Sequence, residues 1–205
     1  MNLTLKEVID NRFTNSRATL VAKGKEYQSA NNRYYQFVEA GKLMNVSPAI
    51  ALIGMQIKHF TPVIDMALST VTKHKSLDSR DTLLNKLEEK SGDLFNYYIL
   101  LAGLNQEEQN LTLLLEEIQD SFKDNSITDL KSVLYHPITE LVSAFKNQHN
   151  HMILLIKDKT FDWEMFSKLL IYNLILEYQI RVYIAKVDCK PEEKDLKDRE
   201  VPNER

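Results

Sequence analysis

The sequence contains a single cysteine, Cys189, and only five glycines and five prolines among its 205 residues. One cysteine excludes a disulfide framework and a cysteine-based zinc site. So few glycines and prolines argue against an all-β sandwich, whose many turns use these residues. The apolar runs fall short of the roughly 20 residues that cross a bilayer, and the N-terminus lacks the pattern of a signal peptide. We therefore expect a cytoplasmic protein that does not enter a membrane.

Charge is distributed unevenly along the chain, although the net charge is only −3. Residues 1–75 carry ten basic and five acidic side chains, whereas residues 76–205 carry sixteen and twenty-four. A basic first third favours contact with phosphate, in a nucleotide or a nucleic acid. The alternative is that helical faces simply differ in their solvated charge. A nucleic-acid-binding protein is usually more basic overall, so nucleic acid is the less favoured partner.

Helical periodicity and capping signals predict an all-α helical bundle. Thr4 is a suitable N-cap for a first helix that reaches about residue 30. Ser47 and Pro48 are a typical start for a third helix, which Pro62 is expected to kink or end before a continuation to about residue 72. Further helices are expected over about 32–44, 82–101 (ended by Gly103), 105–118 (capped by Asn105 and Glu108), from 128 with a disturbance at Pro137, and 163–187, while 152–156 could be a short strand.

The chain divides by pattern into three parts. Residues 1–104 carry the motifs described below, residues 105–187 form an additional helical region expected to pack on the first part, and residues 188–205 form a charged tail expected to be disordered. The segments 94–100 and 170–176 are loosely alike. This similarity is compatible with a degenerate duplication in which one half mimics a dimer partner, or with chance.

The most suggestive chemical pattern lies in the predicted helix 82–101. Glu89 and Asp93 are four residues apart and Asn96 follows three later, so all three lie on one helical face. Two carboxylates and an amide oxygen suit Mg²⁺, which prefers oxygen ligands and substrate phosphates. The alternative is a solvated turn in which Glu89 pairs with Lys86 or Lys90.

Basic residues upstream of this face could meet phosphate. Lys23 and Lys25 flank Gly24, a glycine that could let the backbone approach a ligand closely, and Arg33 and Lys58 follow. Each is also compatible with an ordinary solvated charge. His149 and His151 do not form a metal pair in this interpretation, because side chains two apart on a helix diverge.

In this order, several short motifs resemble a helical domain that is common in bacteriophage genomes and is distantly similar to the all-α nucleoside triphosphate pyrophosphatases of the MazG and dimeric dUTPase group. The resemblance covers about residues 5–104. The motifs are Arg17-x-x-Leu20-x-x-Lys23-Gly24-x-Glu26-Tyr27, Asn32-Arg33 with Phe37, Ala40-Gly41, Pro48-Ala49-x-Ala51-Leu52, Lys58-His59 with Asp65, and Glu89-Lys90-x-Gly92-Asp93-x-x-Asn96-Tyr97-x-x-Leu100-Leu101.

The resemblance implies a MazG-like helical bundle, often dimeric, in which carboxylates on two helices bind Mg²⁺ and present the phosphates of a nucleotide to water. Glu89 and Asp93 match the later acidic pair, Glu26 would be an earlier contributor, and Asn96 would join the metal ligands. The phosphate-binding residues implied are Lys23, Arg33 and Lys58. The implied reaction is in-line attack of water on the α/β-phosphate linkage, with the metal neutralising developing charge.

Three functions stay open from the sequence. The first is a phage-encoded, Mg²⁺-dependent nucleoside triphosphate pyrophosphohydrolase. The second is a non-catalytic phage protein that binds a nucleotide or inhibits a host or defence protein. It is favoured because the group's early helix carries two acidic ligands three apart, whereas Glu26 has Lys23 and Ser29 at those positions. The third is a protein associated with nucleic acid. A homodimer, or a pseudo-dimer within one chain, is expected for the first two.

Overall fold

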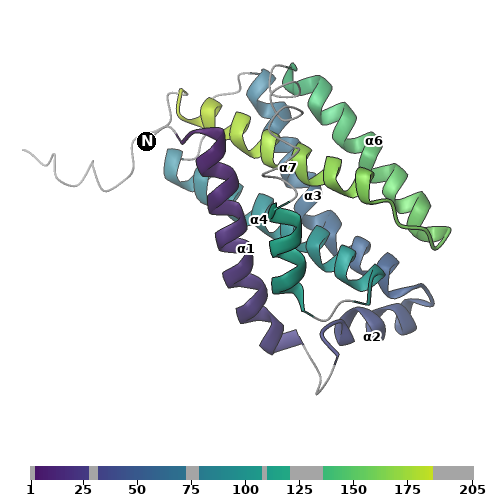
Figure 1. The fold of residues 1–205 in the computed structure, drawn as a ribbon. Coiled ribbons are helices and arrows are strands. Elements are labelled where there is room, and N and C mark those ends of the chain that lie inside the picture. Colours follow the sequence, from purple (N-terminus) through teal and green to yellow (C-terminus); the bar gives the residue numbers. More distant parts are fainter. Residues whose placement is uncertain (1–2, 28–31, 73–78, 108–109, 121–135, 187–205) are drawn as a thin grey trace, which may run out of the picture.

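The chain folds as an all-α helical bundle. The computed structural model describes residues 3–27, 32–72, 79–107, 110–120 and 136–186, and the side chains of 25–27 lie outside this description. Figure 1 shows the helices α1 (Leu5–Tyr27), α2 (Tyr35–Met44), α3 (Pro48–Thr72), α4 (Arg80–Asn105), α6 (Ile138–Lys157) and α7 (Trp163–Ile184). Residues 111–120 are also helical. Within the described ranges, no helix is long and apolar enough to cross a membrane.

Helix α3 lies at the centre of the bundle and packs against α2, α4, α6 and α7. Helix α1 packs against α4 and α7, and in Figure 1 it runs along the side of the molecule opposite α6. Buried side chains from α1 through α7 form one hydrophobic cluster. The predicted additional region therefore shares a core with the first 104 residues, while its origin by duplication stays a prediction.

Two predicted helix starts, each marked by a strong local signal, are confirmed. The Glu7 amide donates to Thr4 Oγ1 and the Thr4 amide donates to Glu7 Oε2, which is a capping box at the start of α1. The Ile50 amide donates to Ser47 Oγ at 3.3 Å, and α3 begins at Pro48. Both starts follow from bonds within one turn of the chain, so the sequence carries them directly.

Two expected helix ends are wrong. Helix α3 does not end at Pro62 but continues to Thr72, since buried Phe60, Val63 and Ile64 on either side hold it against the core, while a kink at Pro62 stays a prediction. Helix α4 passes through Gly103 to Asn105, since this glycine is buried within the packed helix. Burial outweighs the low helix propensity of proline and glycine at these positions.

Two further boundaries also differ from the prediction. The helical segment 111–120 is capped by Asn110, whose Oδ1 accepts the amides of Thr112 and Leu113, rather than by Asn105. Residues 152–156 belong to α6 and not to a strand. Helix α6 starts directly after Pro137. The expected helix start near residue 128 and the charged tail 188–205 lie outside the described residues.

A buried ionic network fastens α1 to α4 and α7. Arg12 is 3% exposed and donates to both carboxylate oxygens of Glu177, from Nε at 3.0 Å and from Nη2 at 2.8 Å. Ser91 Oγ donates to Glu177 Oε2 at 2.7 Å, and Arg181 donates to Glu177 and to Glu88. Every charge in this network is matched by a partner of opposite sign, as buried charges require. The network fixes the surface of α4 that carries the candidate site.

Candidate functional site

A pocket of about 270 Å³ opens between α1, α3, α4 and the start of α2. Its walls combine cationic side chains with an apolar and aromatic surface, and Leu111 of the helical segment 111–120 contributes one further wall. The lining residues are Thr19, Leu20, Lys23, Gly24, Arg33, Gln36, Phe37, Met55, Lys58, His59, Asp93, Asn96, Tyr97, Leu100 and Leu111. Such a mixture of apolar walls with a few converging polar groups is typical of small-molecule sites.

The pocket brings together residues that the sequence predicted to meet phosphate. Lys23 comes from α1, Arg33 from the turn before α2, and Lys58 from α3. Asp93 and Asn96 reach the same pocket from α4. With the histidine neutral, the described lining residues carry a net charge of +2. The arrangement therefore attracts an anion.

Asp93 lies among basic groups and is only partly exposed. Its Oδ1 is 3.5 Å from Lys23 Nζ, and its Oδ2 is 3.4 Å from His59 Nδ1. These separations are longer than those of good charge-assisted hydrogen bonds. The carboxylate is thus held in place by charge while keeping lone pairs available to a ligand.

His59 is a pocket residue to which the sequence analysis assigned no role. Its ring lies 5.3 Å from that of Tyr97, centroid to centroid, and the side chain is almost fully buried. Burial lowers the pKa of His59, an effect that Asp93 partly offsets. The signal in the sequence was its place beside Lys58, but adjacency could not show that it points into the same pocket.

Gly24 makes room for Arg33. A Cβ at position 24 would lie 3.3 Å from Arg33 Nη2, which is closer than most contacts of real side chains. The close neighbour of this glycine is the Arg33 guanidinium, and the predicted approach of a ligand to the backbone stays a prediction. The glycine lets this cation lie directly against α1, on the wall of the pocket.

Glu89 lies outside the pocket, in an adjoining groove of about 400 Å³ between α1 and α4. Its side chain is 60% exposed, and its carboxylate accepts a hydrogen bond from Lys90 Nζ at 2.6 Å. This is the local pairing that the sequence offered as the alternative to a metal site. The Lys90 hydrogen bond lowers the pKa of Glu89. The groove shares Thr19, Lys23, Asp93 and Asn96 with the pocket, so the two are continuous.

The oxygens available for Mg²⁺ are those of Asp93, Asn96 and Glu89. Asn96 Oδ1 is buried without a hydrogen-bond partner, which suits a ligand or a cation. Across the described part of the chain, no three His, Cys, Asp or Glu side chains gather so that they could hold a metal ion. The side chain of Glu26 lies outside that part, so its convergence with Glu89 and Asp93 stays a prediction.

Comparisons of the chain with protein-family models, with curated proteins and with solved structures give no significant match. The resemblance to the MazG and dimeric dUTPase group thus stays an expectation from sequence motifs.

Proposed function

We propose that this protein binds a nucleotide in the pocket between α1, α3, α4 and the start of α2, with the phosphates held by Lys23, Arg33 and Lys58. The observation that carries the proposal is the convergence of these three cations from three separate segments of the chain. A terminal phosphate carries about −1.5 to −2 at pH 7, which complements the net charge of +2 on the described walls.

The apolar part of the pocket supports a nucleotide over a bare phosphate. Phe37, Met55 and Leu100 line it together with the ring of Tyr97. Nucleobases gain about 1–3 kcal/mol by stacking on aromatic side chains. A ligand with a charged end and a flat apolar end would match both halves of this pocket.

Hydrolysis of the bound nucleotide is the second candidate function. The observation in favour is that Asp93 and Asn96 line the phosphate pocket, while Glu89 lies one turn earlier on α4 beside the same opening. A bound Mg²⁺ would supply charge neutralisation at the phosphates. The chain itself would orient the ligand through Lys23, which already lies beside Asp93. Without that activity, the same pocket would serve the non-catalytic, nucleotide-binding alternative.

Isothermal titration with ribo- and deoxyribonucleoside mono- and triphosphates tests binding. We expect Lys58→Gln to weaken binding about tenfold or more, as for the loss of one charge-assisted contact. Lys42→Gln is the matched control, because Lys42 lies on α2 outside the pocket and pairs with Glu39. Equal affinities of the wild type and Lys58→Gln, or no binding of any nucleotide, would contradict the proposal.

Product analysis by anion-exchange chromatography separates the two candidates. With Mg²⁺ or Mn²⁺ present, release of a monophosphate and pyrophosphate by the wild type but not by Asp93→Ala would establish hydrolysis. Asp65→Ala is the control, since Asp65 is an exposed carboxylate on α3 outside the pocket. Binding without turnover would support the non-catalytic alternative.

A further inference from the structure

The groove between α1 and α4 extends the phosphate pocket and has a different chemical character. Two helical faces form it: one from α1 and one from α4, each contributing polar or small side chains. Its lining residues are Arg12, Asn15, Ser16, Ala18, Thr19, Lys23, Glu88, Glu89, Gly92, Asp93 and Asn96. A ligand held by its phosphate in the pocket can therefore reach this groove without leaving the cavity.

Two residues that line the groove each have a buried side-chain oxygen without a hydrogen-bond partner. Ser16 is 1% exposed and its Oγ is unpaired, although a serine within a helix commonly donates to the carbonyl one turn earlier. Asn96 is 8% exposed and its Oδ1 is unpaired. Leaving a buried polar group unpaired is unfavourable, so such atoms point to a ligand or an ordered solvent molecule that satisfies them.

The groove is lined by acceptors and donors. Its donors Arg12 and Asn15 are engaged by Glu177 and Glu88, and Lys23 lies beside Asp93. Asp93 and Glu89 are carboxylates, and the Asn96 oxygen is an acceptor as well. Glu88 also faces the groove, but its oxygens are engaged by Arg12, Arg181 and Asn15. A ligand group that donates hydrogen bonds therefore suits the acceptors that remain in the groove. In a nucleotide, the group next to the phosphates is the sugar, whose hydroxyls are donors.

We propose that the groove binds the sugar of the nucleotide and that Ser16 and Asn96 recognise its hydroxyl groups. This inference rests on the proposed function, because the phosphates in the pocket place the sugar. It assigns the groove a role in choosing between nucleotides with and without these hydroxyls. A site built to bond a hydroxyl rejects an analogue that lacks it, since its buried polar atoms are then left unpaired.

The first test compares ligands that differ only in the sugar. Isothermal titration in EDTA would use a ribonucleoside triphosphate and its 2′-deoxy and 2′,3′-dideoxy analogues, for each of the four bases. We expect the dideoxy compound to bind about five- to tenfold more weakly than the best hydroxyl-bearing analogue, as for one lost hydrogen bond.

The outcomes separate this inference from the function on which it rests. Equal affinities for all three sugars would overturn the inference and leave nucleotide binding intact, whereas no binding of any analogue, in EDTA or with Mg²⁺, would overturn both. A hydroxyl preference that appears only with Mg²⁺ would assign the acceptors to a bound cation and also overturn the inference.

The second test compares two buried serines. Ser16→Ala removes an unpaired oxygen, so we expect unchanged or higher thermal stability together with loss of part of the hydroxyl preference. Ser91→Ala is the matched control, because Ser91 Oγ donates to Glu177 on the face of α4 that meets α7. This variant should lose stability and keep the preference. Full hydroxyl preference in Ser16→Ala would overturn the assignment of Ser16.

Discussion

Gly92 on α4 lies directly against the guanidinium group of Arg12 on α1. A Cβ at position 92 would overlap Arg12 Nη1. The Arg12 side chain cannot move aside without breaking its two hydrogen bonds to Glu177. Because Gly92 has no side chain, the Arg12 side chain of α1 can pass over α4 and reach Glu177 on α7.

Gly92→Ala should therefore destabilise the protein by about 2 kcal/mol or more, since the change pushes on a buried, paired charge. Gly54→Ala is the matched control. Gly54 lies in α3 with no atom within 4 Å of its added Cβ, so alanine there should stabilise by up to about 1 kcal/mol through helix propensity. Chemical denaturation measures both, and similar effects of the two changes would contradict the prediction.

Two ion pairs of α7 have the same spacing in the sequence but differ in burial. Glu177 and Arg181 are four residues apart and nearly all of Glu177 is buried, whereas Glu164 and Lys168 have the same spacing on the surface. We expect Glu177→Leu to cost about 3–5 kcal/mol, because buried Arg12 loses its two bonds to Glu177 and keeps only the partly exposed carboxylate of Glu88. Glu164→Leu should cost less than about 1 kcal/mol. Urea titration of both variants checks this contrast.

Acid should destabilise the protein through His149. This ring is 2% exposed, stacks on Phe60 at 4.2 Å between centroids, and meets the Tyr98 hydroxyl through Nδ1 at 3.2 Å. Burial lowers the pKa of His149 to about 4, while the unfolded value is about 6.5. Between these two pH values His149 is protonated in the unfolded chain but neutral in the folded protein. The free energy of unfolding therefore falls as pH falls from about 6.5 to about 4.

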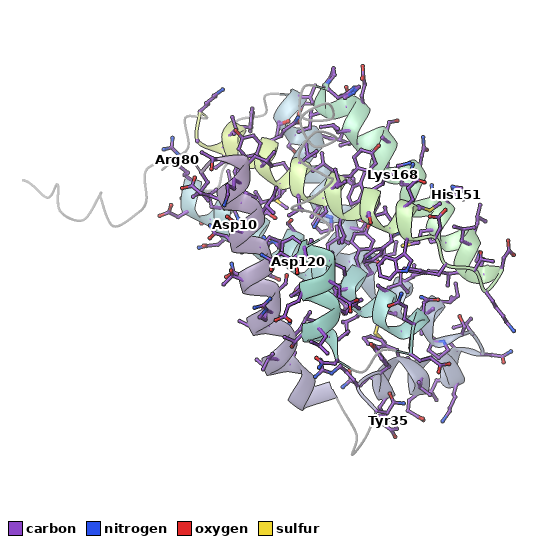
Figure 2. All side chains as sticks on the ribbon, in the orientation of Figure 1. Asp10, Tyr35, Arg80, Asp120, His151 and Lys168 are labelled. Atoms are coloured by element: carbon purple, nitrogen blue, oxygen red, sulfur yellow. The ribbon has the colours of Figure 1, made fainter. Side chains whose placement is uncertain are left out.

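The expected loss from His149 is about 3 kcal/mol across that window, at about 1.4 kcal/mol for each pH unit. His149→Phe should flatten this part of the stability curve. His151→Gln serves as the control, because His151 lies on the same helix but is exposed; it is labelled in Figure 2. An unchanged slope in His149→Phe, measured by denaturation at several pH values, would show that another group is responsible.

Gly24→Ala should separate stability from ligand binding. Alanine improves the helix propensity of α1 by up to about 1 kcal/mol, so the unfolding free energy should rise or stay level. The added Cβ displaces the Arg33 guanidinium by a few tenths of an ångström from the pocket wall. We expect nucleotide affinity to fall about three- to tenfold, as for a weakened charge-assisted bond. Titration calorimetry with Gly54→Ala alongside distinguishes a pocket effect from a general one.

Much of the helical framework follows from local sequence. Thr4 with Glu7 and Ser47 with Pro48 act within one turn, so their helix starts could be predicted. Gly103 misled the prediction, because its effect depends on burial by distant side chains. Local propensity is a weak signal wherever tertiary packing supplies more free energy.

The candidate site could be predicted only in part, because its residues come together through tertiary packing. Lys23, Lys58 and Asp93 stood out by their residue types and by their motifs, and the pocket brings them together. Ser16 did not stand out, since a lone serine in a helix carries no pattern. Arg12 and Glu177 are 165 residues apart, and nothing in the spacing of a single sequence relates two such positions.

That separation has a consequence for how the chain acquires its structure during synthesis. The Arg12 side chain is made early, but the carboxylate that it needs is made 165 residues later. Until α7 has left the ribosome, Arg12 can pair only with the partly exposed Glu88 of α4, and burying α1 then forgoes the two bonds to Glu177. We therefore expect α1 to complete its docking only when α7 is available, so that the two ends of the chain close the bundle together.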